Sequence, residues 1–165
     1  AAGKSTADLS AAELAADSHK FAADEGRYRP VYLVGTGANQ VIILPVAGKG
    51  LWSTVYGFLA LKADRRTVAG VSFYKHGETP GLGGECEKPA FTNQFAGKVI
   101  AGADNQPAFG VAKGKASANT CKNFGGVEHC VDGLSGATIT GNGITTLINR
   151  GVTDYGRFLG VGGEG

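Results

Sequence analysis

The chain has 165 residues and a mass of 16.8 kDa, which is the length of one ordinary domain. Apolar residues make up 42% of it, so it can bury a hydrophobic core, and this argues against a disordered segment. The net charge is +2 and Lys and Arg do not cluster with aromatic residues, which argues against a nucleic-acid partner. The apolar runs are far shorter than the ~20 residues that span a bilayer. Because the sequence contains no Met, we do not expect Ala1 to be a native start, and we expect a targeting or anchoring segment upstream.

The first element that the sequence predicts is a helix over residues 10–24. Ser10 and Glu13 form a capping-box pattern, and the Ala-rich stretch that follows ends before Gly26. Its apolar side is weak, so we expect it at the edge of the main body. We therefore divide the chain into an N-terminal helix within residues 1–26 and a main domain over residues 27–165.

Four β-type runs follow the helix, at residues 31–34, 40–46, 55–62 and 67–75. A short polar turn at residues 63–66 separates the last two, which predicts an antiparallel hairpin. In its second arm the set of Ala69, Val71, Phe73 and Lys75 is mostly apolar, whereas the alternate set, starting with Val68, is expected to face water.

The second half of the sequence alternates loops with short elements. We expect a sharp loop over residues 77–84, a short helix over 91–95, a strand over 107–113 and a helix over about 143–150. Gly151 stands where a C-terminal helix cap would be expected. This order of elements predicts the α+β class, with a twisted antiparallel sheet and flanking helices.

The three cysteines are Cys86, Cys121 and Cys130. Cys121 and Cys130 lie nine positions apart in a loop-like stretch and could form a disulfide in an oxidising compartment. His129 adjoins Cys130, but no C-x-x-C spacing supports a metal site, and we expect none.

The segment most informative about function covers residues 132–140, with the sequence D-G-L-S-G-A-T-I-T. Two glycines and small side chains allow the backbone to turn and to approach a ligand closely. The segment leads into a helix N-terminus, where unpaired N–H groups and the helix dipole favour a phosphate. These properties alone indicate an anion site, and a helix capped by Ser or Thr without any ligand remains an alternative.

Residues 132–138 also resemble the D-G-x-S-G-A-T pattern at which flavin transferases attach FMN to threonine in bacterial flavoproteins. The resemblance implies a phosphoester between the FMN phosphate and the hydroxyl of Thr138, with Thr140 serving as a helix-start residue instead. The residues that it places at the cofactor are Asp132, Ser135, Gly136, Ala137, Thr138 and Thr140.

A second resemblance lies upstream, where residues 76–84 read H-G-E-T-P-G-L-G-G and are similar to a loop of the same FMN-binding domain. Thr79 and the backbone beyond it would hydrogen-bond the flavin, Leu82 would contact its ring, and Glu78 could instead orient the loop. Gly81 and Gly83 complete the expected contacts. A Pro-Gly turn without a ligand is the alternative for this loop.

A third resemblance covers residues 48–61, G-K-G-L-W-S-T-V-Y-G-F-L-A-L, which are similar to the C subunit of the sodium-translocating NADH:quinone reductase. The related G subunit of the Rnf complex lacks the G-x-G-L-W-S signature. Trp52 would line the flavin pocket, because aromatic rings stack favourably. The alternative for Trp52 is that it fills the core.

Together these resemblances imply an electron-transfer subunit of a sodium-translocating NADH:quinone oxidoreductase, with no independent catalysis. It would carry covalent FMN in residues 27–165, assemble with other subunits of a membrane respiratory complex, and need a flavin transferase. It would lie on the periplasmic side of the bacterial inner membrane, held by a helix upstream of residue 1. The alternatives are an Rnf-type or free-standing carrier of covalent FMN, and a non-redox periplasmic anion-binding module.

Overall fold

The computed structural model describes residues 29–162 of the chain. The helix expected over residues 10–24 and the boundary expected at residue 26 lie outside the described residues.

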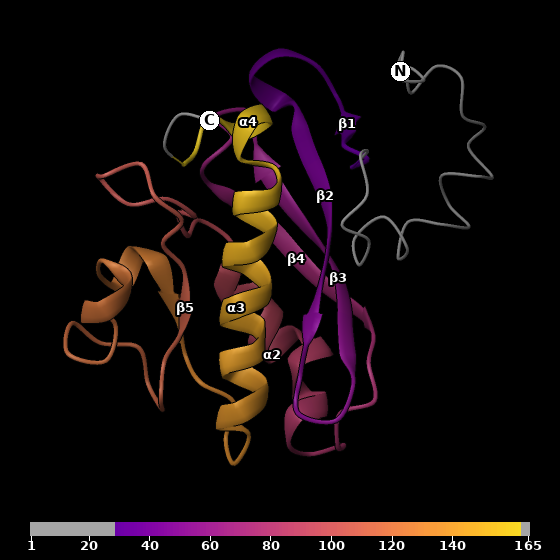
Figure 1. Ribbon diagram of the computed structural model, residues 1–165, viewed down its shortest axis with the longest axis vertical. Helices are drawn as coiled ribbons and strands as arrows, with labels where there is room; N and C mark the ends of the chain where they lie inside the picture. Colours follow the sequence, from indigo (N-terminus) through magenta and orange to yellow (C-terminus); the bar gives the residue numbers. More distant parts are fainter. Residues whose placement is uncertain (1–28, 163–165) are drawn as a thin grey trace.

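A four-stranded antiparallel sheet in the order β1–β2–β3–β4 forms one layer of the fold (Figure 1). Its strands are β1 (Tyr32–Val34), β2 (Val41–Lys49), β3 (Thr54–Lys62) and β4 (Val68–Lys75). All four runs predicted from the sequence are therefore strands, and the β3–β4 hairpin is confirmed. β2 and β3 pair without interruption from Val41 opposite Lys62 to Lys49 opposite Thr54, which leaves residues 50–53 as a tight turn.

The alternation expected along β4 is only partly present. Val68, in the set expected to face water, is buried, and so is Phe73 of the other set. The reason is that register shifts interrupt the pairing of β3 with β4 at Ala60/Leu61 and at Tyr56/Gly57. Each bulge adds a residue on β4 and turns the following side chain to the other face of the sheet.

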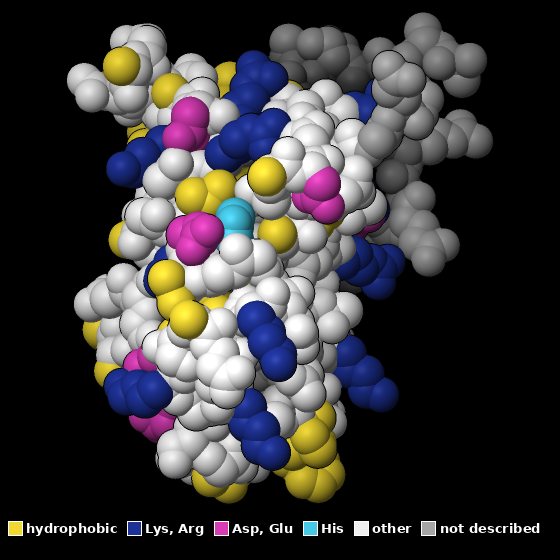
Figure 2. Space-filling view, turned by 90° about the vertical axis from the view of Figure 1, so that its left-hand side faces the viewer, with side chains coloured by type: hydrophobic (Ala, Val, Ile, Leu, Met, Phe, Trp, Pro, Cys, Tyr) yellow, Lys and Arg dark blue, Asp and Glu magenta, His cyan; other side chains and the backbone are white. Residues whose placement is uncertain are grey.

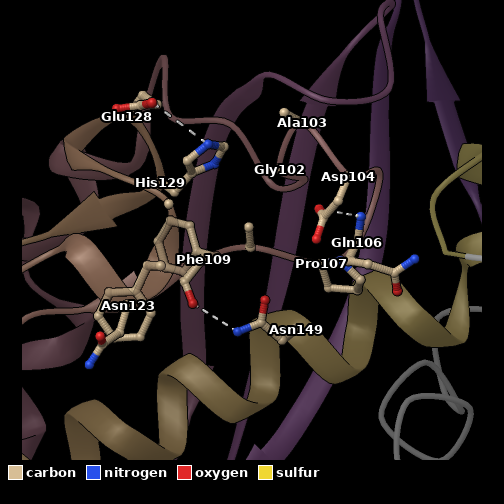
Figure 3. Close-up of a pocket in the computed structure, with 13 residues that line it drawn as sticks. Gly102, Ala103, Asp104, Gln106, Pro107, Phe109, Asn123, Glu128, His129 and Asn149 are labelled. Atoms are coloured by element: carbon tan, nitrogen blue, oxygen red, sulfur yellow. Dashed lines mark hydrogen bonds and ion pairs between the residues drawn. The ribbon is translucent and has the colours of Figure 1, made fainter.

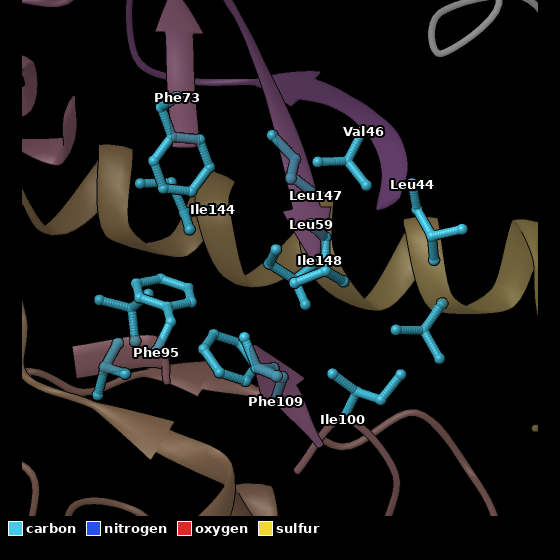
Figure 4. Close-up of a cluster of buried hydrophobic side chains, with 14 of the residues drawn as sticks. Leu44, Val46, Leu59, Phe73, Phe95, Ile100, Phe109, Ile144, Leu147 and Ile148 are labelled. Atoms are coloured by element: carbon cyan, nitrogen blue, oxygen red, sulfur yellow. The ribbon is translucent and has the colours of Figure 1, made fainter. Parts of the chain in front are cut away.

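The helix α3 (Thr138–Asp154) lies along the sheet, and the main core fills the space between them (Figures 1 and 4). Apolar residues recur along α3 at Ile144, Leu147 and Ile148, which puts them on one side of the helix. The other largest completely buried side chains of the core are Ile42, Leu44, Leu59, Leu61, Phe95, Ile100 and Phe109.

The bounds expected for this helix were wrong at both ends, since it begins at Thr138 and continues through Gly151 to Asp154. Gly151 is buried inside the helix, and a Cβ there would lie 2.7 Å from a methyl carbon of Val46 on β2. A Cβ at Gly143 would overlap the carbonyl oxygen of Lys49. These glycines allow the helix to approach β2, so Gly151 is a contact residue and not a cap.

Short elements cover the remaining edge of the core. The helix expected over residues 91–95 is present as α2 (Pro89–Thr92) and the 3-10 turn η4 (Asn93–Phe95). The strand expected over residues 107–113 is only β5 (Gly110–Val111), which pairs in parallel with β6 (Cys130–Val131). The other short elements are η2 (Gly37–Asn39), η3 (Gly83–Glu87), η5 (Lys122–Phe124), η6 (Val127–His129) and α4 (Gly156–Leu159).

Cys121 and Cys130 form a disulfide that closes the loop containing η5 and η6, whereas Cys86 is a buried free thiol. None of the helices within residues 29–162 has the length and apolar character needed to cross a bilayer.

The close approach of α3 to β2 can be tested with Gly143→Ala. In an exposed helix this change stabilises by about 1 kcal/mol. Here the added methyl group overlaps the Lys49 carbonyl, so we expect the free energy of unfolding to fall by about 1–3 kcal/mol. Chemical denaturation measures it, with Asn142→Ala, at an exposed position of the same turn, as the control that should not destabilise. A Gly143→Ala protein more stable than wild type would contradict this packing.

Candidate functional site

Three segments that are distant in the sequence meet at one end of the molecule, where α3 begins (Figure 1). They are the β2–β3 turn, the loop over residues 76–84 and the segment that leads into α3. A Cβ at Gly136 would lie 2.9 Å from a methyl carbon of Leu82, and one at Gly83 would lie 2.5 Å from the hydroxyl of Thr140. The loop over residues 76–84 and the segment over residues 132–140 are thus in direct contact.

A buried carboxylate, that of Glu78, joins all three segments. Its side chain accepts backbone N–H groups from Leu51 (3.0 Å), Trp52 (2.9 Å) and Ser53 (3.2 Å). It also accepts the hydroxyl of Thr140 at 2.5 Å. Glu78 is only 5% exposed and Thr140 is completely buried. Both side chains therefore lie inside the site, where they hold its segments together.

The hydrogen bonds keep Glu78 ionised in this setting. Burial by itself would raise the pKa of the carboxyl group, but the Thr140 hydroxyl and the three N–H groups stabilise the charged form. The balance leaves the pKa of Glu78 below its ordinary value of 4.5. At neutral pH the site therefore contains a buried negative charge with its acceptor positions occupied.

The loop after β4 is built largely from its own hydrogen bonds. Thr79 accepts the N–H of Gly84 through its carbonyl, and Glu85 accepts that of Gly81 through its side chain. Thr79, Gly81 and Leu82 are exposed, whereas Gly83 is buried against Glu78. The loop thus presents the stretch from Thr79 to Leu82 to solvent.

Two polar side chains that the sequence analysis did not select also position this loop. The hydroxyl of Ser53 accepts the N–H of Gly77 at 2.6 Å, and the Nδ1 atom of His76 accepts the N–H of Glu78 at 3.2 Å. Both residues belong to the segments that carry the family resemblance, so the sequence could have indicated them as site residues. It could not indicate their partners, because the contact of residue 53 with residue 77 depends on the tertiary fold.

The segment before α3 separates the remaining expected residues into two groups. Asp132 turns to the neighbouring loop, where it pairs with Lys115 at 2.6 Å and accepts the N–H of Ala116 at 2.8 Å. The Lys115 ammonium and this N–H hold the pKa of Asp132 below its usual range. Ser135 and Thr138, by contrast, are exposed. Asp132 thus fixes the start of the segment, while the two hydroxyls are accessible.

The N-terminus of α3 is open. Its N-cap residue is Ala137, which provides no side-chain hydrogen bond, and the first turn contains no acidic residue. Among the described residues the Thr138 hydroxyl has no partner. The first N–H groups of an α-helix have no partner inside the helix, and the positive end of the helix dipole is located there. The arrangement offers an exposed hydroxyl beside donors that favour an anion.

Large apolar side chains surround this helix start without being buried. Trp52 is 71% exposed, Ile139 58%, Leu82 45% and Leu51 38%. The alternative that Trp52 fills the core is therefore wrong. Leu51 and Trp52 are held by Glu78 through their backbone, and Ile139 follows Thr138 directly. An accessible apolar surface thus adjoins the open N-terminus of α3.

The structural role of Glu78 can be tested with Glu78→Gln. The variant loses the charged acceptor, and we expect the free energy of unfolding at pH 7 to fall by about 1.5–3 kcal/mol. Because the folded-state pKa lies below 4.5, the contribution is complete above about that pH and is lost as the pH falls through the folded-state value. The difference between variant and wild type should therefore shrink in acid.

Denaturation curves from pH 7 to about pH 3 measure this difference. Glu85→Gln, at an exposed carboxylate directly after this loop, is the control. Its amide oxygen can still accept the N–H of Gly81, so stability should change little at any pH. A Glu78→Gln deficit that stays constant into acid would show that the lost stability does not come from the charge.

Comparisons with known proteins show the family to which the chain is related. The model of a family described as FMN-binding domain matches residues 50–153. The chain is 46% identical over 133 residues to the C subunit of the Na(+)-translocating NADH-quinone reductase of Yersinia pestis, which covers 78% of this chain and 47% of that protein. To the corresponding protein of Pseudomonas aeruginosa it is 49% identical over 124 residues, 74% of this chain and 46% of that protein. The chain thus spans about half the length of these curated relatives.

Solved structures show the same fold. The C subunit of the Na(+)-translocating NADH-quinone reductase of Parabacteroides distasonis superimposes with a TM-score of 0.71 at 28% identity, over 98% of this chain and 73% of that one. The NqrC structure of Shewanella oneidensis superimposes with a TM-score of 0.67 at 26% identity, over 93% of this chain and 78% of that one. The α+β class with an antiparallel sheet and flanking helices is confirmed. The chain belongs to the FMN-binding domain family.

Proposed function

We propose that Thr138 carries FMN through a phosphoester, and that the domain transfers electrons as part of a sodium-translocating NADH:quinone reductase. The observation that carries the proposal is the open N-terminus of α3, with the Thr138 hydroxyl exposed beside unpartnered N–H groups. A phosphate ester at this hydroxyl keeps a negative charge where the helix end stabilises an anion by roughly 0.3–1 kcal/mol. The family model that matches residues 50–153 includes this position.

The surroundings of Thr138 also fit a flavin ring. Trp52, Leu82 and Ile139 offer an apolar surface next to the phosphate position, and all three remain accessible. An isoalloxazine ring that rests on such a surface has one edge free for a redox partner. The FMN supplies the electron-transfer chemistry, while this chain's residues set its position, solvent exposure and electrostatics.

In this proposal the expected site residues have two kinds of role, internal support and contact with the flavin. Glu78, Thr140 and Gly83 are internal supports, and Gly136 allows Leu82 to approach. Of the two threonines in the segment that leads into α3, only Thr138 offers a free hydroxyl, because that of Thr140 donates to Glu78. The acceptor of the phosphoester is therefore Thr138 and not Thr140 in this proposal.

Attachment of the flavin requires a separate flavin transferase, because no side chain that could activate the Thr138 hydroxyl as a nucleophile contacts it among the described residues. The relatives are subunits of a Na(+)-translocating NADH-quinone reductase, so we place this chain with other subunits of such a membrane complex. An anchor outside residues 29–162 would hold the domain at the bacterial inner membrane, on the periplasmic side. The disulfide is in keeping with an oxidising compartment.

Two residues of the G-L-W-S part of the signature favour this assignment over an Rnf-type carrier. A Cβ at Gly50 would lie 2.7 Å from a carboxylate oxygen of Glu78, so this position needs glycine. The Ser53 hydroxyl accepts the N–H of Gly77. The support of the site therefore uses residues of the signature that the Rnf subunit lacks.

The proposal predicts the behaviour of Thr138→Ala. When the 165-residue chain is co-expressed with a flavin transferase, wild type should keep its yellow colour after denaturation and filtration, whereas the variant should lose it. Intact mass should show FMN less one water on wild type, because ester formation with the phosphate releases water. Thr146→Ala, at an exposed threonine on the same helix, is the control and should keep the flavin. Flavin that stays bound to the denatured variant would refute Thr138 as the acceptor.

The position of the ring is tested separately with Trp52→Ala in flavin-loaded protein. We expect the covalent flavin to be retained and its fluorescence to rise, because an indole in contact with the ring quenches it. Leu33→Ala, a change of similarly exposed apolar surface on β1, should leave the fluorescence unchanged. Equal fluorescence of wild type and Trp52→Ala would mean that the ring does not rest on Trp52.

A further inference from the structure

Two histidines lie within the described residues, His76 at the start of the loop over residues 76–84 and His129 at the end of η6. Their side chains are only 10% and 9% exposed. Each ring makes one hydrogen bond to a backbone group, and each has a carboxylate near its other nitrogen. The two backbone groups are of opposite kinds, and this difference decides what happens when a ring gains a proton.

His129 contacts a carbonyl group. Its Nδ1 atom lies 2.8 Å from the carbonyl oxygen of Val99, which can only accept, so Nδ1 carries the hydrogen of the neutral ring. A second proton binds Nε2, which lies 3.9 Å from the carboxylate of Glu128 (Figure 3). The space-filling view shows a histidine with acidic side chains next to it at the surface (Figure 2). His129 can therefore become charged without losing its backbone hydrogen bond.

His76 contacts an N–H group instead. Its Nδ1 atom accepts the N–H of Glu78 at 3.2 Å, so Nδ1 holds a lone pair and the hydrogen of the neutral ring is on Nε2. A second proton can bind only at Nδ1, where it faces the N–H of Glu78. Two donors cannot form a hydrogen bond with each other, so the charged ring is incompatible with this contact.

The other side of the His76 ring favours the charged form. Nε2 is buried and has no hydrogen-bond partner among residues 29–162. The Oε2 atom of Glu87 lies 3.3 Å from it, outside the direction of a hydrogen bond, so this carboxylate acts on the ring through its charge. An opposite charge at this distance stabilises an imidazolium. The contacts at Nδ1 and at Nε2 therefore favour opposite charge states of the same ring.

The charged groups around this ring are mostly carboxylates. The turn over residues 50–53 and the first turn of α3 contain no titratable side chain. Lys75, at the end of β4, lies over the ring of Tyr56. Lys88 pairs with Glu87 at 3.1 Å and keeps the pKa of Glu87 below its ordinary value of 4.5, so this carboxylate is charged throughout the range in which histidine titrates. The other titratable groups of the loop and of η3 are Glu78, Glu85 and Cys86.

From these contacts we infer that His76 is a pH-sensitive positioning residue for the loop over residues 76–84. The neutral ring accepts the N–H of Glu78 and so fixes the backbone that carries the buried carboxylate. When a proton from solvent binds Nδ1, this hydrogen bond breaks, and the charged ring pairs with Glu87 instead. Histidine changes its charge between about pH 5 and pH 8, so the loop changes its arrangement within this range.

Glu78 connects this change to the proposed flavin site. Its carboxylate holds the backbone of Leu51 and Trp52, so release of the Glu78 backbone alters the exposed surface on which the flavin ring would rest. This consequence rests on the proposed function. The change in the loop, by contrast, belongs to the polypeptide and does not require the flavin.

The inference is tested first on the flavin-free, ¹⁵N-labelled 165-residue chain. Long-range ¹H–¹⁵N spectra report which ring nitrogen carries a hydrogen, and we expect Nε2 for neutral His76 and Nδ1 for neutral His129. From about pH 8 to about pH 5 the backbone amide of Glu78 should shift with the midpoint of the His76 ring and lose its protection from hydrogen exchange. A hydrogen on Nδ1 of neutral His76, or a Glu78 amide that does not follow the ring, would overturn the inference.

Two replacements of His76 separate the acceptor from its titration. His76→Asn keeps an oxygen that can accept the N–H two residues ahead, as in Asx turns, but it gains no charge in this range. His76→Phe keeps an aromatic ring and removes the acceptor. We expect the Glu78 amide to stay protected down to about pH 5 in the Asn variant and to lack protection even at about pH 8 in the Phe variant. Loss of protection with the wild-type midpoint in His76→Asn would mean that another group titrates and would overturn the inference.

The contribution of Glu87 is tested with Glu87→Gln, which removes an exposed carboxylate and leaves the contact at Nδ1 in place. Because the carboxylate stabilises the charged ring, the His76 midpoint should move to lower pH, by roughly 0.2–0.7 units for an exposed ion pair. Glu128→Gln is the control, because it removes the same charge beside His129 and should leave the His76 midpoint unchanged. A midpoint that stays or rises in Glu87→Gln would contradict the pairing on which the inference depends.

A last measurement separates this inference from the proposed function. In flavin-loaded protein the flavin fluorescence should change with the His76 midpoint in wild type and remain constant in His76→Asn. A loop that responds to pH in the flavin-free chain, without any change of fluorescence in the loaded protein, would count against the proposed position of the flavin ring and not against the role of His76.

Discussion

The buried carboxylate of Glu78 is the contact on which the end of the molecule where α3 begins depends. An isolated buried carboxylate is costly by several kcal/mol, and only well-placed hydrogen bonds offset this. Here the donors come from three successive backbone positions of the β2–β3 turn and from Thr140 in the first turn of α3. These two segments are far apart in the sequence. The hydrogen bonds to the Glu78 side chain therefore fix the position of the β2–β3 turn relative to the start of α3.

The same contact determines what the two threonines at the start of α3 can do. Thr140 lies inside, where its hydroxyl donates to Glu78, and Thr138 lies two positions earlier on the exposed side of the same turn. On a helix, residues two apart point in different directions. Anchoring Thr140 thus turns the Thr138 hydroxyl outward, next to the unpartnered N–H groups. Space for this arrangement depends on Gly50 and Gly83, since a Cβ at either would lie 2.5–3.0 Å from an atom of Glu78 or Thr140.

Much of the fold could be predicted from local patterns, because strands and hairpins leave period-two signals and polar turns. Predictions failed where tertiary contact gave a residue another role. Gly151 has the local properties of a helix cap, yet it allows α3 to approach Val46. Val68 breaks the expected alternation because bulges in β4 change which face a side chain takes.

The site shows the same division between local and tertiary information. Thr138 was selected from the pattern around it, and in the structure its hydroxyl is exposed at the start of α3. The partners of Asp132 and Glu78 could not be predicted from the sequence. Lys115 is 17 positions from Asp132 and Leu51 is 27 positions from Glu78, and no local rule connects these residues.

Because of the disulfide between Cys121 and Cys130, the two ends of the molecule are sensitive to different solution conditions. Closing a loop of this length removes roughly 2.5 kcal/mol of chain entropy from the unfolded state. The loop carries Phe124, whose ring lies against Gly110 of β5, and His129, which is hydrogen-bonded to the Val99 carbonyl. The end of the molecule where α3 begins depends instead on the ionisation of Glu78. A reducing agent should therefore loosen this loop and spare the start of α3, and acid should do the reverse. Redox state and pH thus act on different ends of the molecule.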